Sequence, residues 1–459
     1  MRRLHHPPSA TAPTGQVPSH RHRRRPAVLG ALVAGALALS GLATAPAAQA
    51  HDGHDRSTAF YVPPPDPGAP AQIKALRKAG ARADAARIEA MIETPQAVWV
   101  NGGTSDARTR ADVAAVVRRA AAKRTVPVLV LYNIPYRDCA QYSSGGASNA
   151  AEYASWVRAV AKGIGGRRAV VLLEPDSLGI IPWYTPVGQT SPEWCQPQVD
   201  GAPAPEADPQ TRFAELNDAV DVLTALPKVD LYLDGTHSGW LNVGDITDRL
   251  LKAGVERADG FYLNVSNYQY TVNSQFYGTW ISSCLAWVTR VTTPASVGDC
   301  PNQYWNGGPT NGFNGVALSK YGEWSDTATQ ADLDTASITA RYATMLAGVT
   351  PTARFVVDTS RNGLGPWEPP AGVYPDPQDW CNPTGRGLGP RPTTRTGNPL
   401  AAALLWVKIP GESDGQCNRG VAGSTTDPEW GGIVDPAAGE WFGAMALQLS
   451  RNAVPPLHR

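Results

Sequence analysis

The stretch AVVLLEPD at residues 169–176 places five consecutive aliphatic residues directly before two carboxyl-bearing residues. Ala169–Leu173 shows no alternation of polar and apolar residues, which would mark a strand exposed on one face. A short, continuous apolar run is typical of a parallel strand buried on both faces. Glu174 and Asp176 then stand at the carboxyl end of that strand, where parallel α/β folds bind their ligands.

Six similar runs occur elsewhere: Ala97–Val100, Val126–Tyr132, Val229–Leu233, Gly260–Val265, Arg354–Val357 and Leu404–Ile409. Helix-like segments lie between several of them: Ala107–Lys123, Ala150–Ile164, Arg212–Leu226 and Thr335–Ala347. An alternation of strand and helix repeated about seven times predicts an α/β domain, built as a parallel β/α barrel that is incomplete relative to the eight-unit kind.

Polar residues follow every one of the seven runs. They are Asn101, Arg137, Asp138, Glu174, Asp176, Asp234, His237, Asn264, Asn267, Asp358, Arg361, Asn362, Lys408, Glu412 and Asp414. Aspartate also caps helices and organises turns, so any single position is ambiguous. Their convergence on the same end of seven strands predicts a functional site there.

Three of these aspartates suit the hydrolysis of a glycosidic bond. That reaction needs one carboxylic acid to protonate the leaving oxygen, and a second group as nucleophile or as base toward water. Asp138 follows the strand adjacent to that of Asp176, so the two carboxyl groups would raise one pKa and keep the acid protonated. Asp414 follows the last strand and would approach from the other side of the barrel.

Aromatic residues support a sugar as substrate. The chain has 14 tryptophans, and several flank the polar strand ends: Trp99, Trp183, Trp240, Trp305, Trp367 and Trp380. An indole offers a flat apolar partner for the C–H face of a sugar ring. Any one tryptophan can equally fill the core, but Trp240 and Trp380 are expected in loops, where core packing is less natural.

The first 50 residues have the pattern of an export signal. Arginines cluster at Arg21–Arg25, an apolar run extends from Ala27 to about Leu42, and small residues flank Gln49. The run is too short to favour a membrane span, and a retained N-terminal anchor is the alternative. The expected organisation is a signal peptide at 1–50, a flexible N-terminus at 51–75, and one catalytic domain at 76–459.

Beyond residue 50 the chain holds 34 Lys and Arg residues against 40 Asp and Glu residues. This mildly acidic balance gives no electrostatic footprint for nucleic acid or for an anionic membrane, and a neutral substrate fits it better. We expect a secreted, extracellular monomer.

All six cysteines lie beyond the leader, and an even number in an exported chain indicates disulfides. No pair has C-x-x-C spacing, so neither a metal site nor a redox site is expected. Six cysteines allow fifteen pairings. Their order along the chain makes Cys139–Cys195, Cys284–Cys300 and Cys381–Cys417 the simplest set.

Two segments, YNIPYRDC at 132–139 and LLEPDSL at 172–178, resemble the signatures of glycoside hydrolase family 6. Further matches are YLDGTHSGW at 232–240, NVSNY at 264–268, DTSRNG at 358–363 and WVKIPGESDG at 406–415. The likeness covers essentially the whole chain beyond the leader and is greatest to bacterial cellobiohydrolases. It implies inverting hydrolysis of β-1,4 bonds in cellulose, without a cofactor, on a distorted barrel with a loop-covered cleft or tunnel.

The resemblance also implies roles for individual residues. Asp176 matches the general acid, Asp138 its helper that relays a proton from water, and Tyr132 a tyrosine beneath the sugar at the cleavage point. Asp414 matches a proposed base, although water can instead be activated through a relay. Positions that contact substrate in the family are Trp99, Asp234, His237, Trp240, Asn267, Trp380, Lys408 and Glu412, with the tryptophans as sugar platforms. Cys139–Cys195 and Cys381–Cys417 match the family's usual disulfides. Asn133 and Tyr136 depart from the signature, which often has Asp there.

Long connections bear on whether the enzyme acts at chain ends or within chains. They are 180–208, 268–324 and 416–437, and the second carries Cys284 and Cys300. Long loops are uncommon unless functional, and a disulfide would pin one over the cleft. We therefore expect exo action from non-reducing ends that releases cellobiose. An endoglucanase is the alternative, with surface decoration as the plainest interpretation of the loops.

Three other hypotheses remain open. A non-catalytic glucan-binding protein would use the tryptophans without the acid. Export cleavage would leave His51 at the N-terminus with His54 nearby, as in copper-dependent oxidative enzymes, although a parallel barrel argues against this. A retaining mechanism would need carboxyl groups about 5–5.5 Å apart, against about 6.5–9.5 Å for inversion.

Overall fold

A computed structural model describes residues 58–291, 296–304 and 316–457. The predicted signal peptide, His51, His54 and Trp305 lie outside the described residues. The chain divides into two units, and all described residues belong to the second, Asp55–Arg459. No helix within the described ranges is long and apolar enough to cross a membrane.

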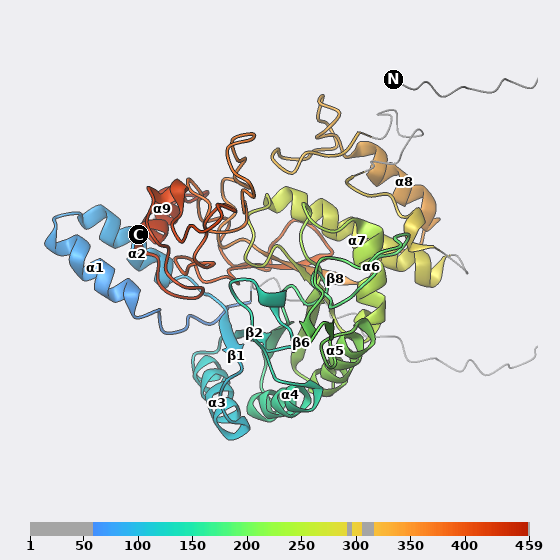
Figure 1. Cartoon of the computed structure of the whole chain (residues 1–459), viewed down its shortest axis with the longest axis horizontal. Coiled ribbons are helices and arrows are strands. Elements are labelled where there is room, and N and C mark those ends of the chain that lie inside the picture. The colour runs from blue at the N-terminus through green and yellow to red at the C-terminus, as the bar shows by residue number, and fades with distance from the viewer. Residues whose placement is uncertain (1–57, 292–295, 305–315, 458–459) are drawn as a thin grey trace, which may run out of the picture. The chain divides into compact units, whose positions relative to one another are not determined.

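Seven parallel strands form one sheet in the order β1-β2-β3-β6-β7-β8-β9 (Figure 1). Their bounds are β1 Val98–Asn101, β2 Val128–Tyr132, β3 Ala169–Leu173, β6 Val229–Asp234, β7 Gly260–Leu263, β8 Arg354–Asp358 and β9 Ala401–Leu405. The seven predicted strands are therefore confirmed, within a few residues at each end. β2 and β3 are buried along their whole length, as the apolar runs require.

The sheet curls into an incomplete barrel. Its edge strands β1 and β9 do not pair with each other in a ladder. A single backbone hydrogen bond, from the Ala97 amide to the Trp406 carbonyl at 2.9 Å, joins the two edges just outside both strands. The Trp99 indole adds a bond to the Val407 carbonyl at 2.9 Å. One face of the sheet packs Val130, Leu172 and further residues into the barrel interior. The barrel is thus distorted and closed at one seam by loop contacts.

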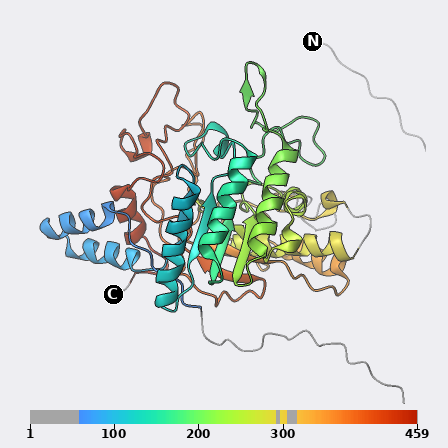
Figure 2. The same cartoon turned by 90° about the horizontal axis from the view of Figure 1, so that it is seen from below.

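Helices cover the outside of the sheet. They are α3 Asp106–Ala122, α4 Ala150–Ile164, α5 Pro209–Thr224, α6 Val243–Lys252, α7 Thr271–Arg290 and α8 Ala336–Leu346. Figure 2 shows α3, α4 and α5 side by side along the sheet. Side-chain caps begin several of them: Asn149 accepts from the Glu152 amide, and Asp208 from the Thr211 amide. α4 was predicted with its observed bounds.

The N-terminal segment is part of the fold earlier than expected. Phe60 is buried and pairs with Val126, and α1 (Gly68–Lys78) and α2 (Arg82–Ile92) pack with α9 (Gly443–Arg451) (Figure 1). Residues 58–75, which the sequence analysis assigned to a flexible N-terminus, are therefore ordered. The partners of α1 and α2 come from α9 at the far end of the chain, so no neighbouring sequence indicates that these helices are packed.

All three disulfides form in the simplest pairing, Cys139–Cys195, Cys284–Cys300 and Cys381–Cys417. The expectation that Cys284–Cys300 pins a loop over the cleft is wrong. Cys284 lies in α7, a 20-residue helix inside the predicted 268–324 loop, and both cysteines are buried in the core between helices and sheet. The 180–208 connection contains a small hairpin, β4 (Gln198–Val199) with β5 (Ala202–Pro203).

Candidate active site

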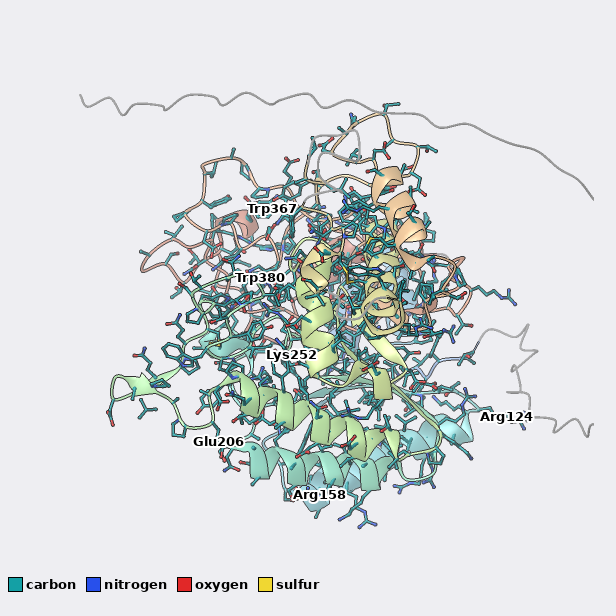
Figure 3. All side chains as sticks on the ribbon, turned by 90° about the vertical axis from the view of Figure 1, so that its right-hand side faces the viewer. Arg124, Arg158, Glu206, Lys252, Trp367 and Trp380 are labelled. Atoms are coloured by element: carbon teal, nitrogen blue, oxygen red, sulfur yellow. A yellow bond between two sulfur atoms is a disulfide. The ribbon has the colours of Figure 1, made fainter. Side chains whose placement is uncertain are left out.

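The carboxyl ends of the strands open into a cleft of about 910 Å³. Eleven of the twelve residues singled out from the sequence line it: Trp99, Tyr132, Asp138, Asp176, His237, Trp240, Asn267, Trp380, Lys408, Glu412 and Asp414. They come from the loops after six different strands and from β1 and β2 themselves. Figure 3 shows Trp367 and Trp380 among the loops, apart from the helical layer that carries Arg158.

Asp234 is the exception, because it lies beneath the cleft instead of lining it. Its side chain is buried, and its Oδ2 accepts from the amides of Leu178 (3.1 Å) and Gly179 (3.3 Å). Its Oδ1 accepts from the Thr236 amide at 2.9 Å. Asp234 therefore holds the loop that carries Asp176, and burial raises the pKa of Asp234 to about 6.

Asp176 sits in a backbone turn that non-glycine residues rarely adopt. Glu174 has φ +52° and Asp176 has φ +66°, a strained arrangement of the kind that concentrates at functional sites. Among the described residues, no side chain hydrogen-bonds the Asp176 carboxyl group. Burial raises its pKa well above the usual range, and the charges of Asp234, Asp138 and Asp414 add to the effect. Asp176 therefore holds a proton that a free aspartate would lose.

Asp138, on the neighbouring loop, resembles Asp176 in its backbone conformation and in its raised pKa. It has φ +59°, and its Oδ2 accepts from the Ser143 amide at 2.7 Å. Burial raises the pKa of Asp138 to about 6, although the Ser143 amide and Arg137 oppose the shift. Arg137 also donates to the Tyr132 carbonyl at 2.5 Å and lies 4.3 Å from the Tyr132 ring centroid. The loop after β2 thus positions a carboxyl group and an aromatic ring together.

Asp414 differs from both, because its carboxyl group accepts hydrogen bonds from three different residues. Arg361, whose side chain is fully buried, donates to Oδ1 at 3.0 Å and to Oδ2 at 2.8 Å. Oδ2 also accepts from the Tyr268 hydroxyl (3.2 Å) and the Asn382 amide (3.0 Å). Lys408 Nζ lies 3.9 Å from Oδ1. These donors fix the position of the Asp414 carboxyl group and offset the cost of burying it.

Further titratable groups line the cleft beside Asp414. Burial raises the pKa of Glu412 to about 7, while Lys408 opposes the shift. Burial lowers the pKa of Lys408, whose ammonium group donates to the Ser413 carbonyl at 3.1 Å. His237 is neutral at ordinary pH, because burial and the nearby Lys320 lower its pKa to about 3. Its Nδ1 accepts from the Gly239 amide at 3.2 Å.

Several lining residues were not singled out from the sequence. Tyr142 and Gln269 line the cleft, as do Lys320 and Asp379, which form an ion pair at 2.5 Å. These residues come from connections between elements, where no periodic pattern marks a position. Asp379 directly precedes Trp380, which the sequence places in a loop, and that neighbourhood is the one available signal.

The described residues contain one group with metal-ligand geometry, Cys417, Asp427 and Asp435. It does not fit a metal. The sulfur of Cys417 is bonded to Cys381, and Arg419 donates to both oxygens of Asp427. The side-chain amide of Asn382 donates a hydrogen bond to Oδ2 of Asp435 at 2.8 Å.

A family model described as Glycosyl hydrolases family 6 matches residues 56–453. Endoglucanase A of Cellulomonas fimi is 34% identical over 86% of this chain, and the chain spans 62% of that protein's length. A probable 1,4-β-D-glucan cellobiohydrolase C of Neosartorya fischeri is 27% identical, covering 80% of this chain and 72% of that protein.

Solved structures give the same result for the fold. The endoglucanase of Mycobacterium tuberculosis, solved with methyl-cellobiosyl-4-deoxy-4-thio-β-D-cellobioside, aligns with a TM-score of 0.57 at 30% identity, covering 86% of this chain and 97% of that one. The cellobiohydrolase core of Chaetomium thermophilum aligns with a TM-score of 0.57 at 23% identity, covering 87% and 98%, and shares the fold. With most of its length matched by the family model, the chain belongs to glycoside hydrolase family 6.

Proposed function

We propose that this protein hydrolyses β-1,4-glucosidic bonds of cellulose with inversion at the anomeric carbon, with Asp176 as the general acid. One observation carries the proposal. Asp176 is a desolvated carboxyl group without a hydrogen-bonding side chain among the described residues, and it faces a cleft between carboxyl neighbours. A carboxylic acid in such surroundings keeps its proton near neutral pH and can donate it to a leaving oxygen.

Asp138 is the group that accepts the proton of the attacking water, directly or through a second water. Its raised pKa of about 6 is close to the pH at which a base works best. Asp414 is less suited to that role, because its carboxyl group already accepts hydrogen bonds from Arg361, Tyr268 and Asn382. Neither the acid nor the base calls for a metal or another cofactor.

The substrate would be a neutral glucan chain that lies along the cleft. Trp99 and Tyr132 meet edge to face at 5.3 Å between ring centroids, and Trp240 and Trp380 line other parts of the cleft. Flat aromatic faces suit the C–H surfaces of β-linked glucose rings. The Mycobacterium tuberculosis relative was solved with a thio-linked cello-oligosaccharide. The leader expected from the sequence and the three disulfides support action outside the cell.

Exo action from non-reducing ends is the mode we favour, and it is supported by a contact between loops at Tyr142. Gln378 Nε2 lies 3.3 Å from the Tyr142 hydroxyl, and the Tyr142 and Trp380 rings are 5.9 Å apart. A side chain at Gly415 would collide with Tyr142. The loop after β2 thus touches the connection after β8 and the loop after β9, across the seam of the barrel. A contact between these loops would restrict the entry of a chain from the side, which supports exo action.

Endo action is the second candidate. Proteins named endoglucanase from Cellulomonas fimi and Streptomyces halstedii are 34% and 32% identical to this chain. The loss of viscosity of carboxymethylcellulose, plotted against reducing ends released, separates the two modes. Slow viscosity loss is expected for exo action, and rapid loss would assign endo action.

Proton NMR of the first product from cellotetraose tests the proposed chemistry. An α-anomer formed first is expected, and a β-anomer formed first would contradict inversion. Wild-type protein and Asp176→Asn are compared on the same substrate. A wild type that binds cellotetraose but releases no sugar would identify a glucan-binding protein instead.

A further inference from the structure

Two loops bring Asp138 and Asp176 together, and both leave the sheet in strained conformations. The loop after β2 contains positive φ angles at Tyr136, Asp138 and Cys139, and the loop after β3 at Glu174 and Asp176. Conformations of this kind cost about 1–3 kcal/mol each and persist only where surrounding contacts impose them. The residues that impose them control the relative position of the two carboxyl groups.

Arg212, in the first turn of α5, donates hydrogen bonds to both loops. Its side chain is 2% exposed, and its guanidinium Nη1 donates to the carbonyls of Ser177 (3.0 Å) and Ile180 (2.9 Å) on the Asp176 loop. The other terminal nitrogen, Nη2, donates to the carbonyl of Pro135 at 2.6 Å on the Asp138 loop. One rigid, planar group therefore joins both loops.

Glu174 joins the same two loops, but it accepts hydrogen bonds where Arg212 donates them. It belongs to the Asp176 loop, and its fully buried Oε2 accepts from the amides of Asn133 (2.8 Å) and Ile134 (2.9 Å) on the Asp138 loop. Arg212 donates to carbonyls and Glu174 accepts from amides, so the two side chains fix both kinds of backbone group. Neither side chain lines the cleft.

We propose that Arg212 and Glu174 are positioning residues that lock the Asp138 loop against the Asp176 loop, and so set the distance between the two carboxyl groups. The inference rests on the proposed function, in which Asp176 is the acid. Burial and the charge of Asp234 raise the pKa of Asp176, and the charge of Asp138 adds to this rise. A loosened lock separates the groups, so the pKa of Asp176 falls and the acid loses its proton at a lower pH.

Arg212→Lys tests this inference, because lysine keeps the charge but offers one nitrogen in place of the planar fork. We expect kcat on cellotetraose to fall about 10- to 100-fold, since small misplacements of reacting groups have effects of this size. We expect KM to stay within about twofold, because no substrate contact changes. The basic limb of the profile of kcat/KM against pH should move to lower pH by about half a unit or more.

Arg419→Lys is the matched control. Arg419 is equally buried, and it donates to the carbonyls of Gln378 (2.9 Å) and Cys381 (2.8 Å), which flank Trp380. We expect this variant to raise KM and to leave the basic limb at the wild-type pH. A fall in kcat for Arg212→Lys with an unmoved basic limb would overturn the inference, since it would reveal a merely structural role.

Glu174 provides the same test where Arg212→Lys does not fold. Glu174→Gln retains an oxygen for the two amides and should keep the wild-type pH profile, whereas Glu174→Met has no strong acceptor and should shift the limb. Equal profiles for these two variants would overturn the inference. A wild type that releases no sugar from cellotetraose would refute the proposed function instead, so the two failures are distinguishable.

Discussion

The rim formed by β2 and β3 and the rim formed by β8 and β9 each present an aspartate to the same cleft, but the two rims treat it in opposite ways. Asp176 is buried among other carboxyl groups, and no described side chain hydrogen-bonds it. Asp414 is buried too, but it accepts hydrogen bonds from Arg361, Tyr268 and Asn382. Desolvation therefore acts on a carboxyl group without partners on one rim and on a carboxyl group with several donors on the other.

This difference teaches that partners, more than position, decide what a buried carboxyl group does. Desolvation disfavours the charged form, and an unpartnered group answers by keeping its proton. A guanidinium group and two further donors offset the same desolvation for Asp414. The first arrangement suits proton donation, and the second suits stabilisation of positive charge at the reacting carbon.

The largest expected effect is the loss of the acid. Asp176→Asn removes the donated proton while keeping the shape of the side chain, so kcat on cellotetraose should fall by at least about 10³-fold. Stability should be unchanged or slightly higher, because a desolvated carboxyl group is removed. Steady-state kinetics and thermal unfolding of the purified variant measure both. A residual rate near that of the wild type would remove Asp176 from the mechanism.

Breaking the ion pair on the other rim should act on stability. Arg361→Met leaves Asp414 buried without its main partner, which destabilises proteins by about 3–5 kcal/mol. The double variant Arg361→Met with Asp414→Leu should recover most of that loss, since an apolar pair avoids the uncompensated charge. Urea unfolding of both variants measures the difference. Equal stabilities of the two variants would show that the folded protein does not depend on the pairing of Asp414 with Arg361.

A smaller effect is expected at Asp138, where the sign follows from electrostatics. Activity requires protonated Asp176, so it is lost as pH rises through the pKa of that group. Burial and the charge of Asp234 raise this pKa, and the charge of Asp138 adds to the rise. Asp138→Asn removes the charge and should move the basic limb of kcat/KM to lower pH, with a fall in kcat of about 10²- to 10³-fold. A basic limb at the wild-type pH would show that the charge of Asp138 does not affect the pKa of Asp176.

Glu174 predicts how stability depends on pH. Its folded pKa, about 8, lies above the usual 4.5 because of burial. A raised folded pKa means that its contribution is complete below pH 4.5 and is lost as pH rises to about 8. The free energy of unfolding should therefore decline with a slope of about 1 kcal/mol per pH unit in that window. Glu174→Gln should remove this part of the slope, and an unchanged slope would show that Glu174 is ionised in the folded protein.

The smallest expected effect concerns the loop contact across the barrel seam. Tyr142→Ala removes the contacts with Gln378 and Trp380, and Tyr142→Phe retains the ring as a control. For the alanine variant we expect a several-fold faster loss of carboxymethylcellulose viscosity per reducing end released. The phenylalanine variant should behave as the wild type. Identical ratios in all three proteins would show that this contact does not enclose the substrate.

Much of the fold could be predicted because strands and catalytic loops are adjacent in sequence. Each apolar run is followed at once by the residues that line the cleft, so Asp138 and Asp176 could be found without the structure. The helix α7 was missed because it is buried on most sides, with every successive residue from Trp280 to Ala286 buried. A helix buried all round carries no apolar stripe to reveal its period.

The hydrogen bonds to Asp414 could not be predicted from sequence. Its partners Tyr268, Arg361 and Asn382 come from three separate segments, and no pattern within any of them indicates a common target. The same holds for Arg212, which was counted as one residue of a helix but joins two loops after other strands. Contacts between distant segments depend on how the barrel closes, and that closure is a property of the whole chain.

The contrast between the two rims is tested most directly by changing the leaving group. The dinitrophenolate of a 2,4-dinitrophenyl β-cellobioside departs without protonation, whereas the sugar released from cellotetraose needs a proton from an acid. We predict that Asp176→Asn loses at least about 10³-fold in kcat on cellotetraose but stays within about tenfold of the wild type on the dinitrophenyl substrate, while Asp414→Asn loses similar factors on both. Equal losses for Asp176→Asn on the two substrates would contradict its role as the acid.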